Sequence, residues 1–213
     1  MLLPIAFFII GYLIFYFALT PIIEPAKTIY GLAFSNVNAS TTDVSQGKDM
    51  FSGHLGVYEG TIKASEIHFP YVDDKWGELT VESIGIENMD LIYGDNTANL
   101  LRGACMSERS RLPGFGSGTL VAAHNYSFFH ELQNIEVGAE VKVETYYGSY
   151  VYKVYRTEII DVYATKDYWD EVYGDEDIFV LYTCYPNNAL RSTHYRFFAF
   201  CELVSGPKVD EFN

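Results

Sequence analysis

The chain has 213 residues, of which 49% are hydrophobic and 16% aromatic, and its formal net charge is −14 at pH 7. This length suits one domain of ordinary size with an appendage, and the apolar content is sufficient for a packed core. A protein this acidic repels polyanions, so the charge argues against nucleic acid as a partner.

The N-terminal stretch, residues 2–23, is apolar and contains no charged side chain. As a helix it would be about 33 Å long, which is enough to cross the hydrocarbon core of a membrane. We therefore predict an uncleaved transmembrane anchor over residues 1–24. A cleaved signal peptide is the alternative, although its apolar region is normally shorter, about 7–15 residues.

Residues 25–76 are predicted to form a linker and an N-terminal extension. Ser, Thr, Asn and Asp predominate in residues 35–47, a composition typical of a partly disordered linker. We place the edge of the main domain at Trp76-Gly77, so this domain covers residues 77–205 and a short tail follows at 206–213.

From residue 78 onward the pattern is that of β-strands, seven or eight of them at irregular spacing, with few helices and no alternation of strands and helices. The predicted strands cover residues 79–86, 91–93, 119–123, 141–145, 150–160, 178–184 and 196–204. Short helices or helical turns are predicted at 64–68, 100–102 and 127–134, and an acidic loop or short helix at 164–177. The pattern indicates an all-β barrel or sandwich.

Three chemically useful side chains stand at the ends of separate predicted strands. Cys184 ends the apolar strand 178–184, Arg196 begins the next strand, and His124 ends the strand that lies sixty residues upstream of Cys184. A cysteine nucleophile reacts as the thiolate and needs a basic neighbour, for which His124 is the candidate. Arg196 could stabilise the charge that develops on a substrate carbonyl oxygen.

Residue types alone do not settle this hypothesis, because a lone cysteine after an apolar run is more often part of the core. Cys105, Cys184 and Cys201 cannot all pair, so at least one is a free thiol or links to another chain.

Three motifs add a family resemblance. The segment Gly118-Thr-Leu-Val-Ala-Ala-His-Asn-Tyr resembles the histidine motif of sortases, the membrane-anchored cysteine transpeptidases of Gram-positive bacteria. Leu181-Tyr-Thr-Cys-Tyr-Pro is similar to their Thr-Leu-x-Thr-Cys motif, and Arg196 resembles the arginine that opens their last strand. The likeness covers about residues 77–205, with matching order and spacing.

The resemblance implies a closed eight-stranded β-barrel with short helices, preceded by the transmembrane helix, and an extracytoplasmic catalytic domain on a single-pass membrane protein. It implies that Cys184 attacks the threonine carbonyl of a Leu-Pro-x-Thr-Gly-like sorting signal with His124 and Arg196 as partners. The acceptor would be an amine of a peptidoglycan precursor or of a pilin subunit. The expected substrate contacts are Thr183, Tyr185 and Asn125.

Several points stay open at this stage. Arg191 lies closer to Cys184 in sequence than Arg196, which we prefer because it leads straight into a strand. Thr-Cys-Tyr-Pro resembles the class D sortases, whereas His-Asn-Tyr resembles other classes, so the subclass is open. A hydrolytic cysteine peptidase and a non-catalytic, membrane-tethered peptide-binding β-barrel are the alternative functions.

No cofactor and no metal site are predicted. The loop 164–177 is strongly acidic, and in one branch of sortases acidic residues nearby bind Ca²⁺. The spacing of its carboxylates fits no EF-hand, so we favour a solvated acidic loop over a calcium site. The histidines outside the motif show no metal-ligand spacing; they are His54, His68, His130 and His194.

Overall fold

A computed structural model of the chain describes residues 10–12, 15, 49–51, 60–187 and 193–212. Residues 1–41 and 189–192 belong to a unit separate from the rest of the chain, and of this unit residues 10–12 and 15 are helical. The predicted membrane anchor falls almost wholly outside the described residues, and of the predicted linker and extension only residues 49–51 and 60–76 are described. None of the helices that are described is long and apolar enough to cross a membrane.

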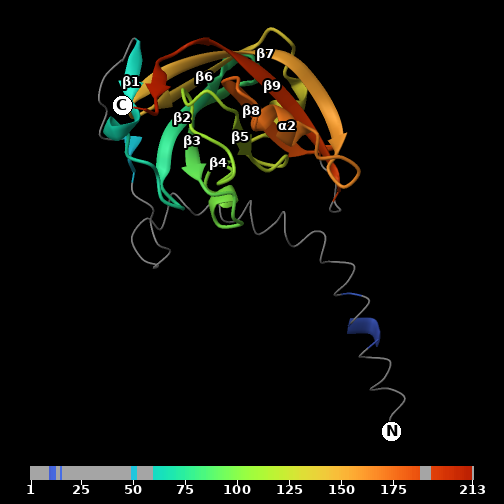
Figure 1. Cartoon of the computed structure of the whole chain (residues 1–213). Coiled ribbons are helices and arrows are strands. Elements are labelled where there is room, and N and C mark those ends of the chain that lie inside the picture. Colours follow the sequence, from blue (N-terminus) through green and yellow to red (C-terminus); the bar gives the residue numbers. More distant parts are fainter. Residues whose placement is uncertain (1–9, 13–14, 16–48, 52–59, 188–192, 213) are drawn as a thin grey trace. The chain divides into compact units, whose positions relative to one another are not determined.

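In the described part of the second unit, eight strands close into a barrel in the order β2-β3-β4-β5-β8-β9-β7-β6 (Figure 1). The barrel strands are β2 (Lys75–Val81), β3 (Ile86–Tyr93), β4 (Ala104–Met106), β5 (Thr119–Ala122), β6 (Glu140–Thr145), β7 (Gly148–Asp161), β8 (Ile178–Cys184) and β9 (Tyr195–Ser205). The short helices are η2 (Ala64–Glu66), η3 (Glu82–Ile84), η4 (Asn99–Leu101), η5 (His130–Asn134) and α2 (Tyr168–Val172). The predicted closed, eight-stranded all-β barrel is confirmed.

The β6–β7 hairpin shows how the sequence pattern sets local structure. Alternation of buried and more exposed residues in β6 places Val141, Val143 and Thr145 toward the core. The turn residues are Tyr146 and Tyr147. The Thr145 hydroxyl accepts the Gly148 N–H at 2.9 Å and donates to the Gly148 carbonyl at 2.8 Å, which closes the hairpin.

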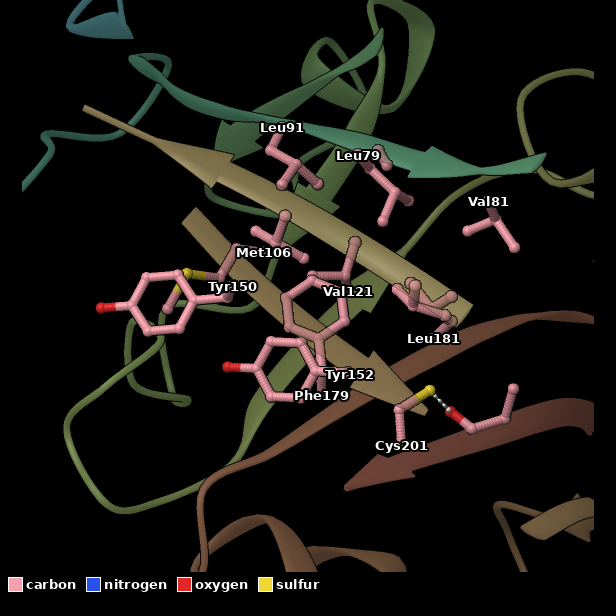
Figure 2. Packing of buried hydrophobic residues seen from close by; sticks show 14 of the residues in the cluster. Leu79, Val81, Leu91, Met106, Val121, Tyr150, Tyr152, Phe179, Leu181 and Cys201 are labelled. Atoms are coloured by element: carbon pink, nitrogen blue, oxygen red, sulfur yellow. Dashed lines mark hydrogen bonds between the residues drawn. The ribbon is translucent and has the colours of Figure 1, made fainter. Parts of the chain in front are cut away.

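The barrel is filled by one large apolar cluster, and Figure 2 shows some of its members, among them Leu79, Leu91, Val121, Tyr150 and Tyr152. Tyr152 packs on Phe179 with ring centroids 5.2 Å apart. Alternate residues of β8 and β9, among them Val180 and Phe198, belong to a second cluster, which also contains Val172 of α2. Because successive side chains of a strand point to opposite faces, this second cluster covers the outer surface of β8 and β9.

Two predicted strands are divided differently in the structure. The expected strand 79–86 is the end of β2, a turn at η3 and the start of β3, which continues through the expected strand 91–93. Gly85 makes this reversal at φ 68°, a left-handed conformation that costs glycine least. The break in alternation at Ser83 marks the turn.

Other differences concern very short elements. No strand is predicted between residues 93 and 119, but the three residues of β4 are buried and pair with both β3 and β5. The expected helix 127–134 is a 3₁₀ helix limited to η5, whose Leu132 is buried. Trp76 and Gly77, the expected domain edge, lie inside β2, where a Cβ on Gly77 would lie 2.4 Å from the Glu144 carbonyl oxygen.

The segments assigned to the extension and the tail also pair with each other. β1 (Thr61–Lys63) and β10 (Lys208–Asp210) form a parallel two-stranded sheet, and the Val209 N–H donates to the Gly114 carbonyl at 2.8 Å. This small sheet fastens the C-terminal segment to the connection that precedes β5.

Candidate active site

Three neighbouring strands bring the predicted site residues together. Cys184 and Arg196 are direct partners in the antiparallel β8–β9 pair, so their side chains share one face, with Cβ atoms about 4.5–5.5 Å apart. β5 runs parallel to β8 with Ala122 opposite Tyr182. His124 and Cys184 each come two residues later, so His124 reaches the level of the thiol.

The site lies on the outer face of the barrel, next to the second apolar cluster. Tyr182 precedes Cys184 by two residues and Phe198 follows Arg196 by two, so both rings share the face of the site. Their ring centroids are 5.2 Å apart with nearly parallel planes, and Tyr168 of α2 lies 4.9 Å from Phe198. An apolar floor therefore continues from the thiol toward α2.

The three cysteines differ sharply in their surroundings, and all three are free. Cys105 and Cys201 are fully buried. Burial raises the pKa of Cys105 to about 12 and also raises the pKa of Cys201. Cys184 is only half-buried. Cys184 is therefore the one cysteine that a substrate in solution can approach without opening the core.

His124 is held in a partly dry setting. Desolvation by the surrounding protein lowers the pKa of the imidazole from its ordinary value. The ring stacks on Tyr126, with centroids 4.7 Å apart and planes 15° from parallel. The backbone N–H of Phe129 donates to the His124 carbonyl at 3.0 Å and fixes the turn that follows. A neutral imidazole in this position can accept a proton at neutral pH.

Thr183 lies on the face opposite to Cys184, and its side chain is almost fully buried. Its hydroxyl donates to the Ala123 carbonyl at 2.7 Å, and the Ala123 N–H donates to the Tyr182 carbonyl at 3.4 Å. Thr183, which directly precedes Cys184, is thus hydrogen-bonded to Ala123, which directly precedes His124. The structure places this hydroxyl in the framework, although the expectation from sequence was contact with substrate.

The segment after Cys184 is tied to the turn after His124. The Asn125 side-chain amide donates to the Pro186 carbonyl at 3.0 Å, and the Tyr185 N–H donates to the Tyr195 carbonyl at 3.0 Å. Gln133 of η5 donates to the Cys184 carbonyl at 3.2 Å. Gln133 was not expected, because a contact across 51 positions has no local signal in the sequence.

Arg196 is partly buried at the start of β9. Its Nη1 donates to the Tyr195 carbonyl at 2.9 Å and also to the Thr193 carbonyl. Among the residues that the structure describes, no acceptor is found for the hydrogens on Nε and Nη2. Arg191 lies outside the described residues, so the preference for Arg196 over Arg191 stays a prediction.

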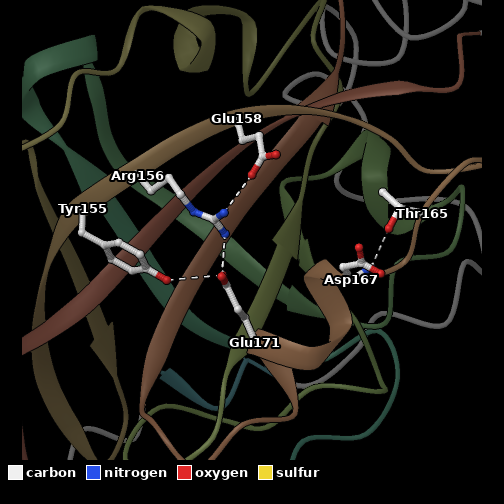
Figure 3. Close-up of polar contacts among 6 residues, drawn as sticks. All are labelled: Tyr155, Arg156, Glu158, Thr165, Asp167 and Glu171. Carbon is white, nitrogen blue, oxygen red and sulfur yellow. Dashed lines mark hydrogen bonds and ion pairs between the residues drawn. The ribbon is translucent and has the colours of Figure 1, made fainter.

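Part of the acidic loop before β8 serves to hold α2 in place. Arg156 of β7 lies 4.1 Å over the Phe200 ring and donates to both carboxylate oxygens of Glu171 at 2.7 Å (Figure 3). Asp177 accepts the Tyr152 hydroxyl at 2.8 Å and the Gly114 N–H at 2.6 Å.

Across the residues that the structure describes, no three His, Cys, Asp or Glu side chains gather as metal ligands would.

Comparisons with known proteins point to one family. The model of the sortase domain matches residues 79–204. Among solved structures, sortase A of Listeria monocytogenes is 25% identical, with a TM-score of 0.54, and the match covers 64% of this chain and 91% of that chain. No curated protein matches the chain.

Two further solved structures support the fold alone. A sortase D5 transpeptidase of Clostridium perfringens is 18% identical, with a TM-score of 0.55, over 63% of this chain and 82% of that chain. A sortase C of Clostridium perfringens, solved with the C-terminal cell wall sorting motif, is 20% identical with a TM-score of 0.55, over 63% and 73%.

Proposed function

The chain belongs to the sortase family, and from this membership we propose that Cys184, His124 and Arg196 form its active site. It is a cysteine transpeptidase of a family that cleaves sorting signals and transfers the cleaved proteins to the cell wall or to pilins. The observation that carries the assignment is the strand register, because it sets Cys184 opposite Arg196 and His124 level with both.

In the first half of the proposed reaction, His124 accepts the proton of the Cys184 thiol. The sulfur then attacks the threonine carbonyl carbon of the sorting signal and forms a C–S bond. The C–N bond to the next residue breaks, and His124 passes its proton to the departing amine. The lowered pKa of His124 suits this sequence, because the imidazole begins neutral and holds the proton only briefly.

In the second half, the nitrogen of an incoming amine attacks the thioester carbonyl. An amide C–N bond forms and the C–S bond breaks. The proton of the amine moves to His124 and then to the sulfur, which restores the starting state. In both halves the Nε and Nη2 hydrogens of Arg196 stabilise the oxyanion of the tetrahedral intermediate.

The proposed substrate is a protein with a Leu-Pro-x-Thr-Gly-like signal, cleaved after the threonine. The apolar floor beside Cys184, formed by Tyr182, Phe198 and Tyr168, supports binding of the apolar part of this signal. A related sortase C has been solved with a C-terminal sorting motif. The acceptor is an amine of a peptidoglycan precursor or of a pilin subunit, and Tyr185 and Asn125 stay proposed substrate contacts.

We also propose that the protein is anchored in the cell membrane by residues 2–23, with the catalytic domain outside the cytoplasm. The support is the uncharged apolar composition of that stretch. Extraction of cell membranes with sodium carbonate tests the anchor: the full chain should stay in the membrane fraction, and release into the supernatant would contradict it.

The proposed reaction is tested with the full chain and a library of Leu-Pro-x-Thr-x peptides, with and without an added amine. Mass spectrometry should show a thioacyl adduct on Cys184 and, with the amine, an amide product. Cys105→Ala serves as the control for loss of a thiol and should still form the adduct. Only hydrolysed peptide at every amine concentration would point to a hydrolytic cysteine peptidase instead.

A further inference from the structure

Polar contacts join the end of β7 to the residue that precedes β9. The Asp161 carboxylate accepts the Tyr163 N–H at 3.0 Å and the Ala164 N–H at 3.3 Å. The same oxygen lies 2.7 Å from Nδ1 of His194. The Val162 N–H donates to the His194 carbonyl at 3.0 Å. The backbone of His194 is therefore hydrogen-bonded to the turn that follows β7, and its side chain lies in close contact with the same turn.

Aromatic contacts hold the imidazole further. The ring of His194 stacks on Tyr163, with centroids 5.5 Å apart and planes 11° from parallel. It also lies against Tyr195, with centroids 4.3 Å apart. Its bond to His194 is the main reason that the pKa of the Asp161 carboxyl is lowered, so the carboxylate stays ionised near neutral pH. We name the contact among Asp161, Tyr163 and His194 the β7–β9 latch.

The latch is directly connected to Arg196. Thr193 and Tyr195 flank His194, and their carbonyls are the two acceptors of Arg196 Nη1. Moving the backbone at His194 would move both acceptors. The direction of the guanidinium plane therefore depends on the place of His194, although His194 lies two residues away from Arg196.

We propose that His194, held by Asp161 and Tyr163, is a positioning residue that fixes the two carbonyls orienting the Arg196 guanidinium beside Cys184. This inference rests on the proposed role of Arg196 in the reaction. A contact between two partly exposed polar side chains adds little to overall stability. The effect of the latch is thus expected on the geometry of the site and not on the unfolding of the barrel.

The kinetic test uses the full chain. His194→Ala should lower kcat about tenfold with little change in KM, because small errors in placing a catalytic group are costly. His194→Asn should recover part of the loss, since its amide nitrogen can occupy the place of Nδ1. His130→Ala is the matched control, because His130 Nδ1 also lies 2.7 Å from a carboxylate, that of Glu131, at similar exposure. Equal effects of His194→Ala and His130→Ala would overturn the proposal.

A second measurement separates this proposal from the proposed function. The NMR signal of the Arg196 Nε–H group, assigned through its loss in Arg196→Lys, should shift in His194→Ala and stay in place in His130→Ala. A signal unmoved by His194→Ala would overturn the latch even in a fully active enzyme. Conversely, a shifted signal in a chain that forms no thioacyl adduct would leave the latch standing and refute the reaction.

Discussion

The two ends of β8 carry ionisable groups in opposite settings. At its start Asp177 is partly buried, lines a hollow together with Lys208 and Val209 of β10, and accepts hydrogen bonds from the Tyr152 hydroxyl and the Gly114 N–H. At its end Cys184 is half-buried beside His124 and Arg196. The same strand thus contributes a hydrogen-bonded carboxylate at one end to stability and an accessible thiol at the other end to chemistry, so mutations at the two ends should have separable effects.

The largest separable effect is expected for Cys184→Ala. Loss of the nucleophile should lower turnover by a factor of about 10⁴ or more. The free energy of unfolding should change by no more than about 0.5 kcal/mol, because the side chain is not part of the buried core. Peptide turnover and urea denaturation measure the two quantities, and a large loss of stability would show that the accessible end also serves the fold.

The reverse outcome is expected for Asp177→Ala. Removing the carboxylate leaves the Tyr152 hydroxyl and the Gly114 N–H without their buried acceptor, which should cost about 2–4 kcal/mol of unfolding free energy. Native-state alkylation of Cys184 should keep its rate. Glu176→Ala, an exposed neighbour in the same loop, is the control and should change stability by no more than about 0.5 kcal/mol. Equal losses of unfolding free energy in Asp177→Ala and Glu176→Ala would show that the hydrogen bonds of Asp177 do not stabilise the fold.

A smaller effect is expected when the support of His124 is changed. Tyr126→Leu removes the stacked ring and should lower kcat/KM several-fold, by less than about a factor of ten. Tyr126→Phe keeps the ring and should retain most activity. If the phenylalanine variant loses as much as the leucine variant, the hydroxyl and not the stacking supports the imidazole.

The pH dependence gives the finest test of the accessible end. The reaction needs neutral His124. The value of kcat/KM should therefore be highest above the pKa of this imidazole and should fall as the pH drops through that pKa. Because desolvation lowers that pKa, the acidic limb should lie below the ordinary value of 6.5. In Tyr126→Leu the imidazole gains contact with water, and the limb should move toward higher pH. A limb above 6.5 in the unmodified chain would contradict the assignment of His124.

Much of this arrangement was predictable from sequence, for physical reasons that differ by element. The long apolar runs around Cys184 and Arg196 have strong β patterning, and their order supports the barrel. β4 was missed because three residues are too few to show a period. The pairing of β1 with β10 joins segments about 150 residues apart and has no local signal.

Within the site, the alternation of side chains along a strand could be read from the sequence, whereas contacts between distant segments could not. Thr183 must face away from the side of Cys184, so a framework role was readable from the alternation alone. The bond from Gln133 to the Cys184 carbonyl was not readable, because it depends on how η5 packs in three dimensions. The contact between His194 and Asp161 likewise depends on the β7–β9 register.

A crystal structure of the full chain with a substrate mimic on Cys184 would show directly whether His124 and Arg196 flank the reacting sulfur. A sorting-signal peptide whose threonine carries a thiol in place of its carboxyl group can be joined to Cys184 as a disulfide. We expect Arg196 to donate to the bound peptide beside the sulfur and His124 to lie on the other side of the sulfur. A bound peptide contacted there by Arg191, with Arg196 turned away, would contradict the account.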